Sequence, residues 1–150
     1  MKKFRFKKHE LMEDDVILKE DGFICNGRIA IKENLASINK NFNAKYLTLK
    51  ENAEKVNATL NPLWNTLMDV LEINKIDIDD LIEVEISDKR NNFFTPIFLK
   101  NTELNRRAEN AVIDRFSAIS PEIKFYSNKY FSKVFVVLNN EIIGLFMAIM

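Results

Sequence analysis

The sequence predicts an α+β domain built on antiparallel strands, with two to three helices packed on one face of the sheet. Three observations predict this fold class. Residues 123–150 have the strands and turns of a three-stranded meander, residues 49–72 have helical spacing, and residues 2–31 contain short strands separated by turn signals. The expected order is β-β-β, α-α, β-β, α, β-β-β, in a single domain that spans residues 1–150.

The C-terminal meander is the most informative part of the chain. Its strands are expected at Ile123–Ser127, Tyr130–Leu138 and Glu141–Ile149, with a polar break at Asn128-Lys129 and a tight turn at Asn139-Asn140. Two adjacent asparagines tolerate the positive φ angles of a two-residue hairpin turn. The last two strands are too apolar to expose one face, so they require cover from a helix, from the rest of the sheet or from a partner.

The N-terminal part of the chain is predicted to be β-structure. Lys2–Lys8 alternates basic and aromatic residues, which indicates a half-buried strand with a cationic outer row. Asp21-Gly22 and Asn26-Gly27 separate further strand segments. These segments form either two tight hairpins or one hairpin whose second strand carries a bulge at Asn26-Gly27. We favour the bulge, because Phe23–Cys25 would be a very short strand between two hairpins.

Two short helices are predicted in the middle of the chain. Thr48 and Glu51 have the spacing of a capping box, and apolar residues follow at helical spacing. Asn61-Pro62 ends this helix and begins a second one that runs to about residue 72, because proline is favoured in the first turn of a helix. A third helix is expected over 103–117, from the spacing of Leu104, Ala108, Val112 and Phe116.

A β-hairpin is expected before the third helix. Leu81–Ser87 alternates apolar and acidic residues, and Phe93–Lys100 follows a polar turn. Pro96 lies inside the second strand and cannot donate a ladder hydrogen bond. This strand is therefore expected at a sheet edge, or with a bulge.

The composition indicates an ordinary globular protein. The 150 residues are 47% hydrophobic and 29% charged, and 22 basic residues balance 22 acidic ones. A domain with zero net charge can bind nucleic acid only through a local patch. Cys25 is the single cysteine, which excludes an internal disulfide and favours a reducing, cytoplasmic location. No apolar run approaches the roughly 20 residues that span a bilayer, so no membrane association is expected.

No catalytic constellation stands out. His9 is the only histidine, and nothing in the spacing places it beside Cys25 or a serine, as a nucleophile–base pair requires. The acidic cluster in residues 77–85 lacks the glycine and the spaced oxygen ligands of a calcium loop. We therefore expect no enzyme activity, catalytic residue, cofactor, metal or small-molecule substrate. An enzyme would require a deep pocket in which Cys25 and His9 converge.

Basic and aromatic residues are interleaved in several segments, which is a pattern typical of nucleic-acid binding. Cations contact phosphates, and rings stack on bases. The candidate nucleic-acid-binding residues are Arg5, Lys7, Arg106 and Arg107. The alternative explanation is structural, because strands alternate and aromatic residues favour strands.

Three parts of the sequence resemble the β-type sliding clamps of bacteria and phages. Phe125–Ser127, Val134–Val137 and Ile142–Met147 together are similar to the C-terminal hairpin of these clamps, and Phe42–Leu47 and Gly22–Ile31 resemble two other clamp segments. The resemblance covers about a third of the chain, and one helix followed by three strands fits a clamp half-domain. Ala148 stands where the clamps have a proline. The resemblance implies a non-catalytic function, in which the protein grips duplex DNA through phosphates and docks partner peptides in an apolar groove.

Two functions are therefore expected as alternatives. In the first, the chain is a diverged phage or mobile-element sliding-clamp-like protein that contacts duplex DNA and associates with the DNA replication machinery. In the second, it is a protein-interaction module or inhibitor without a nucleic-acid role. It would then form a homo-oligomer or capture another protein through its apolar C-terminal strand. The candidate partner-binding residues are Leu145, Phe146, Met147 and Met150.

Overall fold

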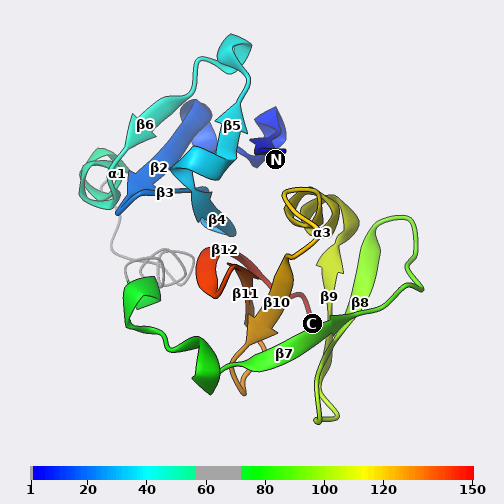
Figure 1. The fold of residues 1–150 in the computed structure, drawn as a ribbon. Coiled ribbons are helices and arrows are strands. Elements are labelled where there is room, and N and C mark those ends of the chain that lie inside the picture. Colours follow the sequence, from blue (N-terminus) through cyan, green and yellow to red (C-terminus); the bar gives the residue numbers. More distant parts are fainter. Residues whose placement is uncertain (1, 57–71) are drawn as a thin grey trace. The chain divides into compact units, whose positions relative to one another are not determined.

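The computed structural model describes residues 2–56 and 72–150 (Figure 1). The chain forms two compact units, residues 3–75 and residues 76–150, and each is described by itself. The α+β class is confirmed, because strands dominate both units and helices α1 and α3 accompany them. The single domain and the shared helix-covered face stay predictions. The predicted second helix, after Asn61-Pro62, lies outside the described residues.

The N-terminal unit is made of short strands. Four of them form a sheet in the order β6-β2-β3-β4, and β1 pairs with β5 in a separate sheet. The pairs β1–β5 and β2–β6 are parallel, so the purely antiparallel sheet that we predicted is wrong for this unit. The elements are β1 (Phe4–Phe6), β2 (Val16–Glu20), β3 (Phe23–Cys25), β4 (Ile29–Lys32), β5 (Ala36–Ile38), β6 (Lys45–Leu47) and α1 (Leu49–Val56).

Two tight hairpins join β2, β3 and β4, so the bulge that we favoured at Asn26-Gly27 is wrong. Strand β3 pairs with β2 on one side and with β4 on the other. The Asn26 side chain holds the second turn: its Oδ1 accepts from the N–H groups of Arg28 and Ile29, at 3.0 and 2.8 Å, and its Nδ2 donates to the Glu10 carbonyl at 2.7 Å. Side-chain bonds to the backbone therefore stabilise a strand of only three residues.

Helix α1 begins with the predicted capping box. The Glu51 N–H donates to Thr48 Oγ1 at 3.1 Å, and the Thr48 N–H donates to a Glu51 carboxylate oxygen at 2.9 Å. The two bonds satisfy backbone donors that have no partner inside the helix.

The C-terminal unit is an antiparallel sheet in the order β12-β11-β10-β7-β8-β9 (Figure 1). The predicted meander is confirmed in β10, β11 and β12, and Asn139 and Asn140 have φ angles of 52° and 61°, as its tight turn requires. The elements of this unit are β7 (Ile82–Ile86), β8 (Phe94–Leu99), β9 (Asn105–Glu109), α3 (Asn110–Ser117), β10 (Lys124–Ser127), β11 (Lys133–Leu138) and β12 (Glu141–Met147).

The helix predicted over 103–117 is wrong in its first half. Residues 105–109 form strand β9, and α3 begins only at Asn110. The spacing of Leu104 and Ala108 was misleading, because four residues are two periods of a strand and also close to one turn of a helix. Every residue of 105–109 pairs with β8 in an antiparallel ladder, and this pairing makes the segment a strand.

Pro96 lies in a strand that is paired on both sides, so the expected edge position or bulge is wrong. Strand β8 lies between β7 and β9. Pro96 is opposite Arg107 of β9, and the N–H and carbonyl of Arg107 bond to Ile149 rather than to β8. Toward β7, the Pro96 carbonyl accepts from the Ser87 N–H at 3.0 Å, one residue beyond the end of β7. The N–H group that Pro96 lacks would therefore have stood at the end of the hydrogen-bond ladder between β7 and β8, where its absence interrupts no bond inside the ladder.

Aromatic packing forms the core of the C-terminal unit. Phe146 of β12 stacks on Phe116 of α3, with ring centroids 5.7 Å apart, and meets the edge of Phe125 of β10 at 6.0 Å. All three rings are buried. Beyond β12, Ile149 forms a bridge to Arg107 of β9, so the first and last strands of this sheet are joined. No helix in the described ranges is long and apolar enough to cross a membrane.

Candidate functional site

A cationic row lies on the outer side of β1. Phe4 and Phe6 are fully buried, and their rings pack edge to face with centroids 5.2 Å apart. Because side chains alternate along a strand, this anchoring turns Arg5 outward, and Lys3 and Lys7 on either side of it are exposed as well. We call Lys3, Arg5 and Lys7 the β1 cationic row. The predicted pair Arg5 and Lys7 is thus brought onto one exposed edge of the N-terminal unit.

The residues that follow the β1 cationic row are held by contacts with acidic and aromatic side chains. The Lys7 N–H donates to a Glu10 carboxylate oxygen at 2.8 Å, which fixes the backbone just after β1. Lys8 lies 3.4 Å from an Asp15 carboxylate oxygen and 5.8 Å from the centre of the Phe42 ring. The Asp15 carboxylate offsets the charge of Lys8.

The second predicted pair, Arg106 and Arg107, is not brought together. Neighbouring residues in a strand point to opposite faces, and both lie in β9. Arg106 is half-buried, with its guanidinium carbon 5.8 Å from the centre of the Phe131 ring. Arg107 is exposed, with its guanidinium carbon 4.5 Å from the centre of the Phe94 ring. The two side chains therefore cannot form one phosphate-binding patch.

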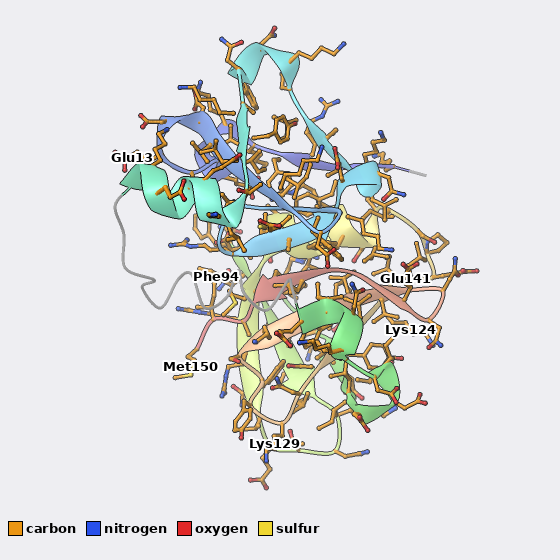
Figure 2. All side chains as sticks on the ribbon, turned by 90° about the vertical axis from the view of Figure 1, so that its left-hand side faces the viewer. Glu13, Phe94, Lys124, Lys129, Glu141 and Met150 are labelled. Atoms are coloured by element: carbon orange, nitrogen blue, oxygen red, sulfur yellow. The ribbon has the colours of Figure 1, made fainter. Side chains whose placement is uncertain are left out.

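The predicted partner-binding residues of the last strand are mostly core. Leu145 and Phe146 are 1% and 2% exposed, and Met147 is half-buried. Met150 is 88% exposed and projects from the end of the chain (Figure 2). The cover that these apolar strands require is therefore present within the chain at Leu145 and Phe146.

The sequence reasoning missed an exposed aromatic stripe on β8. Thr95, Ile97 and Leu99 are buried, so the alternate residues Phe94, Pro96 and Phe98 form the outer side of the strand. Phe98 is 42% exposed, and Phe93, just before the strand, is 73% exposed. Residues Phe94–Leu99 are mostly apolar on both sides of the strand, so the sequence carries no alternation that shows which side is exposed.

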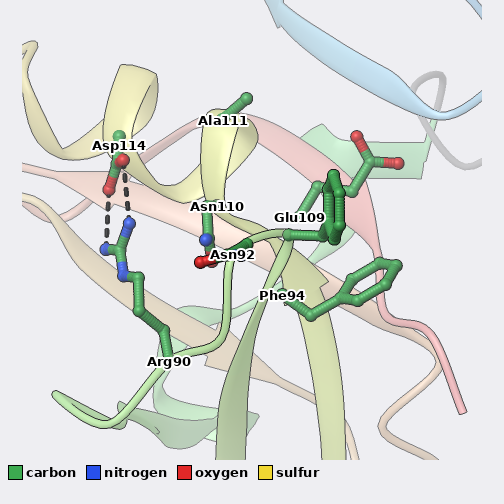
Figure 3. Close-up of a pocket in the computed structure, with 8 residues that line it drawn as sticks. Arg90, Asn92, Phe94, Glu109, Asn110, Ala111 and Asp114 are labelled. Atoms are coloured by element: carbon green, nitrogen blue, oxygen red, sulfur yellow. Dashed lines mark hydrogen bonds and ion pairs between the residues drawn. The ribbon is translucent and has the colours of Figure 1, made fainter.

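A hollow of about 540 Å³ lies between the β7–β8 loop and the start of α3. Two of the charged groups that line it are paired: both terminal nitrogens of Arg90 donate to the Asp114 carboxylate, at 2.9 and 2.8 Å (Figure 3). This pairing raises the pKa of Arg90 and lowers that of Asp114, in both cases chiefly through the hydrogen bonds. The Asn110 amide is held by the Thr95 hydroxyl and the Asn91 carbonyl. The hollow is therefore a structural joint between loop and helix.

Cys25, His9 and the acidic cluster are the residues that were considered for catalysis or metal binding, and the structure shows the surroundings of each. Cys25 is buried, and desolvation raises the pKa of its thiol to about 12, so it stays protonated at neutral pH. His9 is exposed in the short helix after β1. Asp77 of the acidic cluster accepts from the Asp79 N–H at 3.0 Å. In the part of the chain that the structure describes, no three metal-ligating side chains gather at one point.

Comparisons of the chain with protein-family models, with curated proteins and with solved structures give no match. A function for this protein must therefore be argued from its own surfaces.

Proposed function

We propose that this protein is a non-catalytic nucleic-acid-binding protein that contacts phosphates through the β1 cationic row. The observation that carries the proposal is the rigid presentation of this row. Phe4 and Phe6 are both fully buried, and Arg5 lies between them, opposite Ser37 of β5. Three cations on an ordered strand lose less conformational entropy on binding than three cations on a mobile tail.

Charge supports a local contact of this kind. The chain has no net charge, so attraction to DNA depends on cations that are concentrated in one place. Residues 2–8 contain five basic residues and no acidic one. Contacts of lysine and arginine with phosphates carry no sequence information, so we expect binding that does not depend on base sequence.

The biological role that we propose is association with the DNA replication machinery as a diverged sliding-clamp-like protein. Its support is the resemblance of the C-terminal segments. The C-terminal unit also has one helix followed by three strands, α3-β10-β11-β12, an order that fits a clamp half-domain.

Salt-dependent binding to a labelled DNA duplex, measured by fluorescence anisotropy, tests the DNA proposal. Each phosphate contact contributes a slope of about −0.9 in log K against log salt concentration, so the three-residue row predicts a slope of about −3. Arg5→Glu/Lys7→Glu should weaken binding strongly and flatten this slope. The matched control Lys45→Glu/Lys50→Glu changes two exposed lysines of the same unit and should have a much smaller effect.

Two results would contradict the proposal. One is the absence of binding at low salt by the unchanged protein. The other is an equal loss of affinity in the Arg5/Lys7 variant and in the control, which would indicate a diffuse charge effect. The variant Arg106→Glu/Arg107→Glu separately tests a contribution from β9, and we expect it to change binding no more than the control does, because Glu109 lies on the same side of β9 as Arg107.

A protein-interaction module is the second candidate. The observation that favours it is the exposed aromatic stripe on β8, because exposed rings beside arginine are typical of protein interfaces. This stripe replaces the C-terminal strand as the surface through which such a module would act, since Leu145 and Phe146 are buried.

A further inference from the structure

The outer side of β7, β8 and β9 forms one continuous surface whose composition varies across the strands. The stripe of Phe94, Pro96 and Phe98 runs along the middle strand. In the register of the sheet, Glu85 of β7 lies beside Phe98, and Arg107 of β9 lies beside Pro96. Glu85 and Arg107 are both exposed. We call this surface the β8 outer face: an apolar stripe with a carboxylate on one flank and a guanidinium on the other.

The charges on this face favour a protein over a nucleic acid as its ligand. Glu83 and Glu85 lie on the β7 flank, and Glu109 lies on β9 beside Phe94. Carboxylates around exposed rings repel a phosphate backbone. A protein surface with both signs of charge does not meet this repulsion, and its aromatic residues gain from burial.

Glu85 on one flank and Arg107 on the other make the face complementary to itself at these two positions. We propose that the β8 outer face is the contact between two copies of this chain in a two-fold symmetric dimer. If the symmetry axis runs along β8, the β9 flank of one copy covers the β7 flank of the other. In an isologous contact every such pairing occurs twice, so one favourable pair of residues contributes two interactions.

The sheet register specifies which residues meet. Ser87, Pro96 and Arg107 lie in one row across the sheet, and Glu85, Phe98 and Asn105 lie in the next row. With the axis along β8, the row of Ser87 faces the same row of the second copy. The row of Phe98 likewise faces the same row of the second copy. Phe98 then meets Phe98 of the second copy. Arg107 lies over Ser87 and one row from Glu85, which is roughly 7 Å along the strand and within the reach of an arginine side chain.

The position of Arg107 suits this contact. Its guanidinium lies over the Phe94 ring, and a stacked guanidinium uses its flat face and keeps its N–H donors at the edge. On the other flank, Lys100 lies 3.5 Å from a Glu83 carboxylate oxygen, so Glu85 is the carboxylate that we assign to the partner's arginine. Two sheets that pack face to face lie about 10 Å apart, which leaves room for the interleaved rings of Phe94 and Phe98.

This proposal does not depend on DNA binding, because the β1 cationic row contributes nothing to it. It does rest on the second candidate function, and it names the partner as a second copy of the chain. Failure of the dimer therefore leaves the DNA proposal unaffected. The anisotropy measurement described above reports on that proposal separately.

Exchange of charges between two variants tests the dimer. The full chain should show a concentration-dependent dimer by sedimentation velocity, and Arg107→Glu and Glu85→Arg should each weaken dimerisation at least tenfold. An equimolar mixture of the two variants should dimerise at least tenfold more tightly than either alone. In the mixed dimer the introduced glutamate of one chain meets the introduced arginine of the other, and the second contact is the original pair of Arg107 and Glu85.

Phe98→Gln is a third variant, expected to weaken the dimer while the chain stays folded by circular dichroism. Asp80→Arg and Lys129→Glu, which alter exposed charges before β7 and after β10, are the matched control and should leave the dimer unchanged. The proposal is overturned if the unchanged chain stays monomeric up to about 1 mM, the range of a weak complex. It is also overturned if a dimer forms that none of the three face variants weakens, or if the mixed variants show no recovery.

Discussion

Arg107 and Ile149 exchange two backbone hydrogen bonds, in which the Arg107 N–H donates at 2.9 Å and the Ile149 N–H donates at 2.8 Å. These bonds connect β9 to the residues that follow β12. In the sheet order, β9 and β12 are the two outermost strands of the C-terminal unit. One pair of residues therefore joins the two sides of the sheet and gives β9 a hydrogen-bonding partner on its second edge.

Loss of this bridge should lower the stability of the C-terminal unit. Ile149→Pro removes one of the two donors, and we expect the free energy of unfolding to fall by about 1 kcal/mol, the net contribution of a typical intramolecular hydrogen bond. Urea unfolding measures this change. Ile149→Ala keeps the N–H group and is the control for the shorter side chain. If both variants lose the same stability, the backbone bond is not the cause.

The buried aromatic cluster should tolerate no truncation at Phe146. This ring is 2% exposed and contacts Phe116 and Phe125, so Phe146→Ala should reduce the free energy of unfolding by about 3–5 kcal/mol. Chemical denaturation is the measurement. Tyr130→Ala removes a ring that is 67% exposed and should change the stability by no more than about 0.5 kcal/mol. Similar losses in both variants would show that Phe146 is not a core residue.

The Asn139-Asn140 turn should discriminate among residues at its second position. Asn140 has a φ of 61°, a conformation that costs a β-branched residue about 1–2 kcal/mol and costs glycine little. We expect Asn140→Val to lower the midpoint of thermal unfolding clearly and Asn140→Gly to leave it nearly unchanged. Equal midpoints for the two variants would mean that the turn does not adopt this conformation.

Cys25 should be unreactive in the folded protein. Its thiol is buried, and a pKa of about 12 leaves very little thiolate at pH 8. Labelling with a thiol reagent at pH 8 should therefore be slow in buffer and fast in concentrated denaturant. Fast labelling of the folded chain would contradict the burial of β3.

The pair of Arg90 and Asp114 should contribute to stability only while the carboxylate is ionised. Hydrogen bonds from Arg90 lower the pKa of Asp114 below the ordinary value of 3.8. Its contribution is therefore complete above pH 3.8 and is lost as the pH falls below that value through the lowered pKa. Asp114→Asn should be slightly less stable than the unchanged protein at pH 7, and the difference should shrink below pH 3.8. Thermal unfolding across this pH range measures it. A difference that does not vary with pH would contradict an ionic contribution.

Local sequence patterns predicted those elements that local forces determine. The capping box of Thr48 and Glu51 is formed within one helical turn, and the Asn139-Asn140 turn depends on the φ preferences of two residues. Strand β7 alternates in the way that a half-buried strand must. The prediction for β1 held for the same reason, since Phe4 and Phe6 bury their rings and leave Arg5 outside.

The candidate site residues were predicted less well than the strands, because a site depends on which face a side chain occupies. Arg106 and Arg107 are adjacent in the sequence and were treated as one pair while their segment was expected to be helical. Once the segment is a strand, alternation places them on opposite sides of the sheet. The aromatic stripe on β8 was not predicted, because both sides of this strand are mostly apolar and only the tertiary packing decides which side is covered.

By itself, the sequence determined the α+β class, the closing meander and the cationic row of β1, because hydrophobic periodicity and turn chemistry act over a few neighbouring residues. Only the tertiary structure decided that residues 105–109 form a strand, that Phe146 belongs to the core and that the last residues bridge to β9. These features depend on pairing between segments far apart in the chain. Hydrogen bonds and ring contacts across such distances leave no local pattern in the sequence.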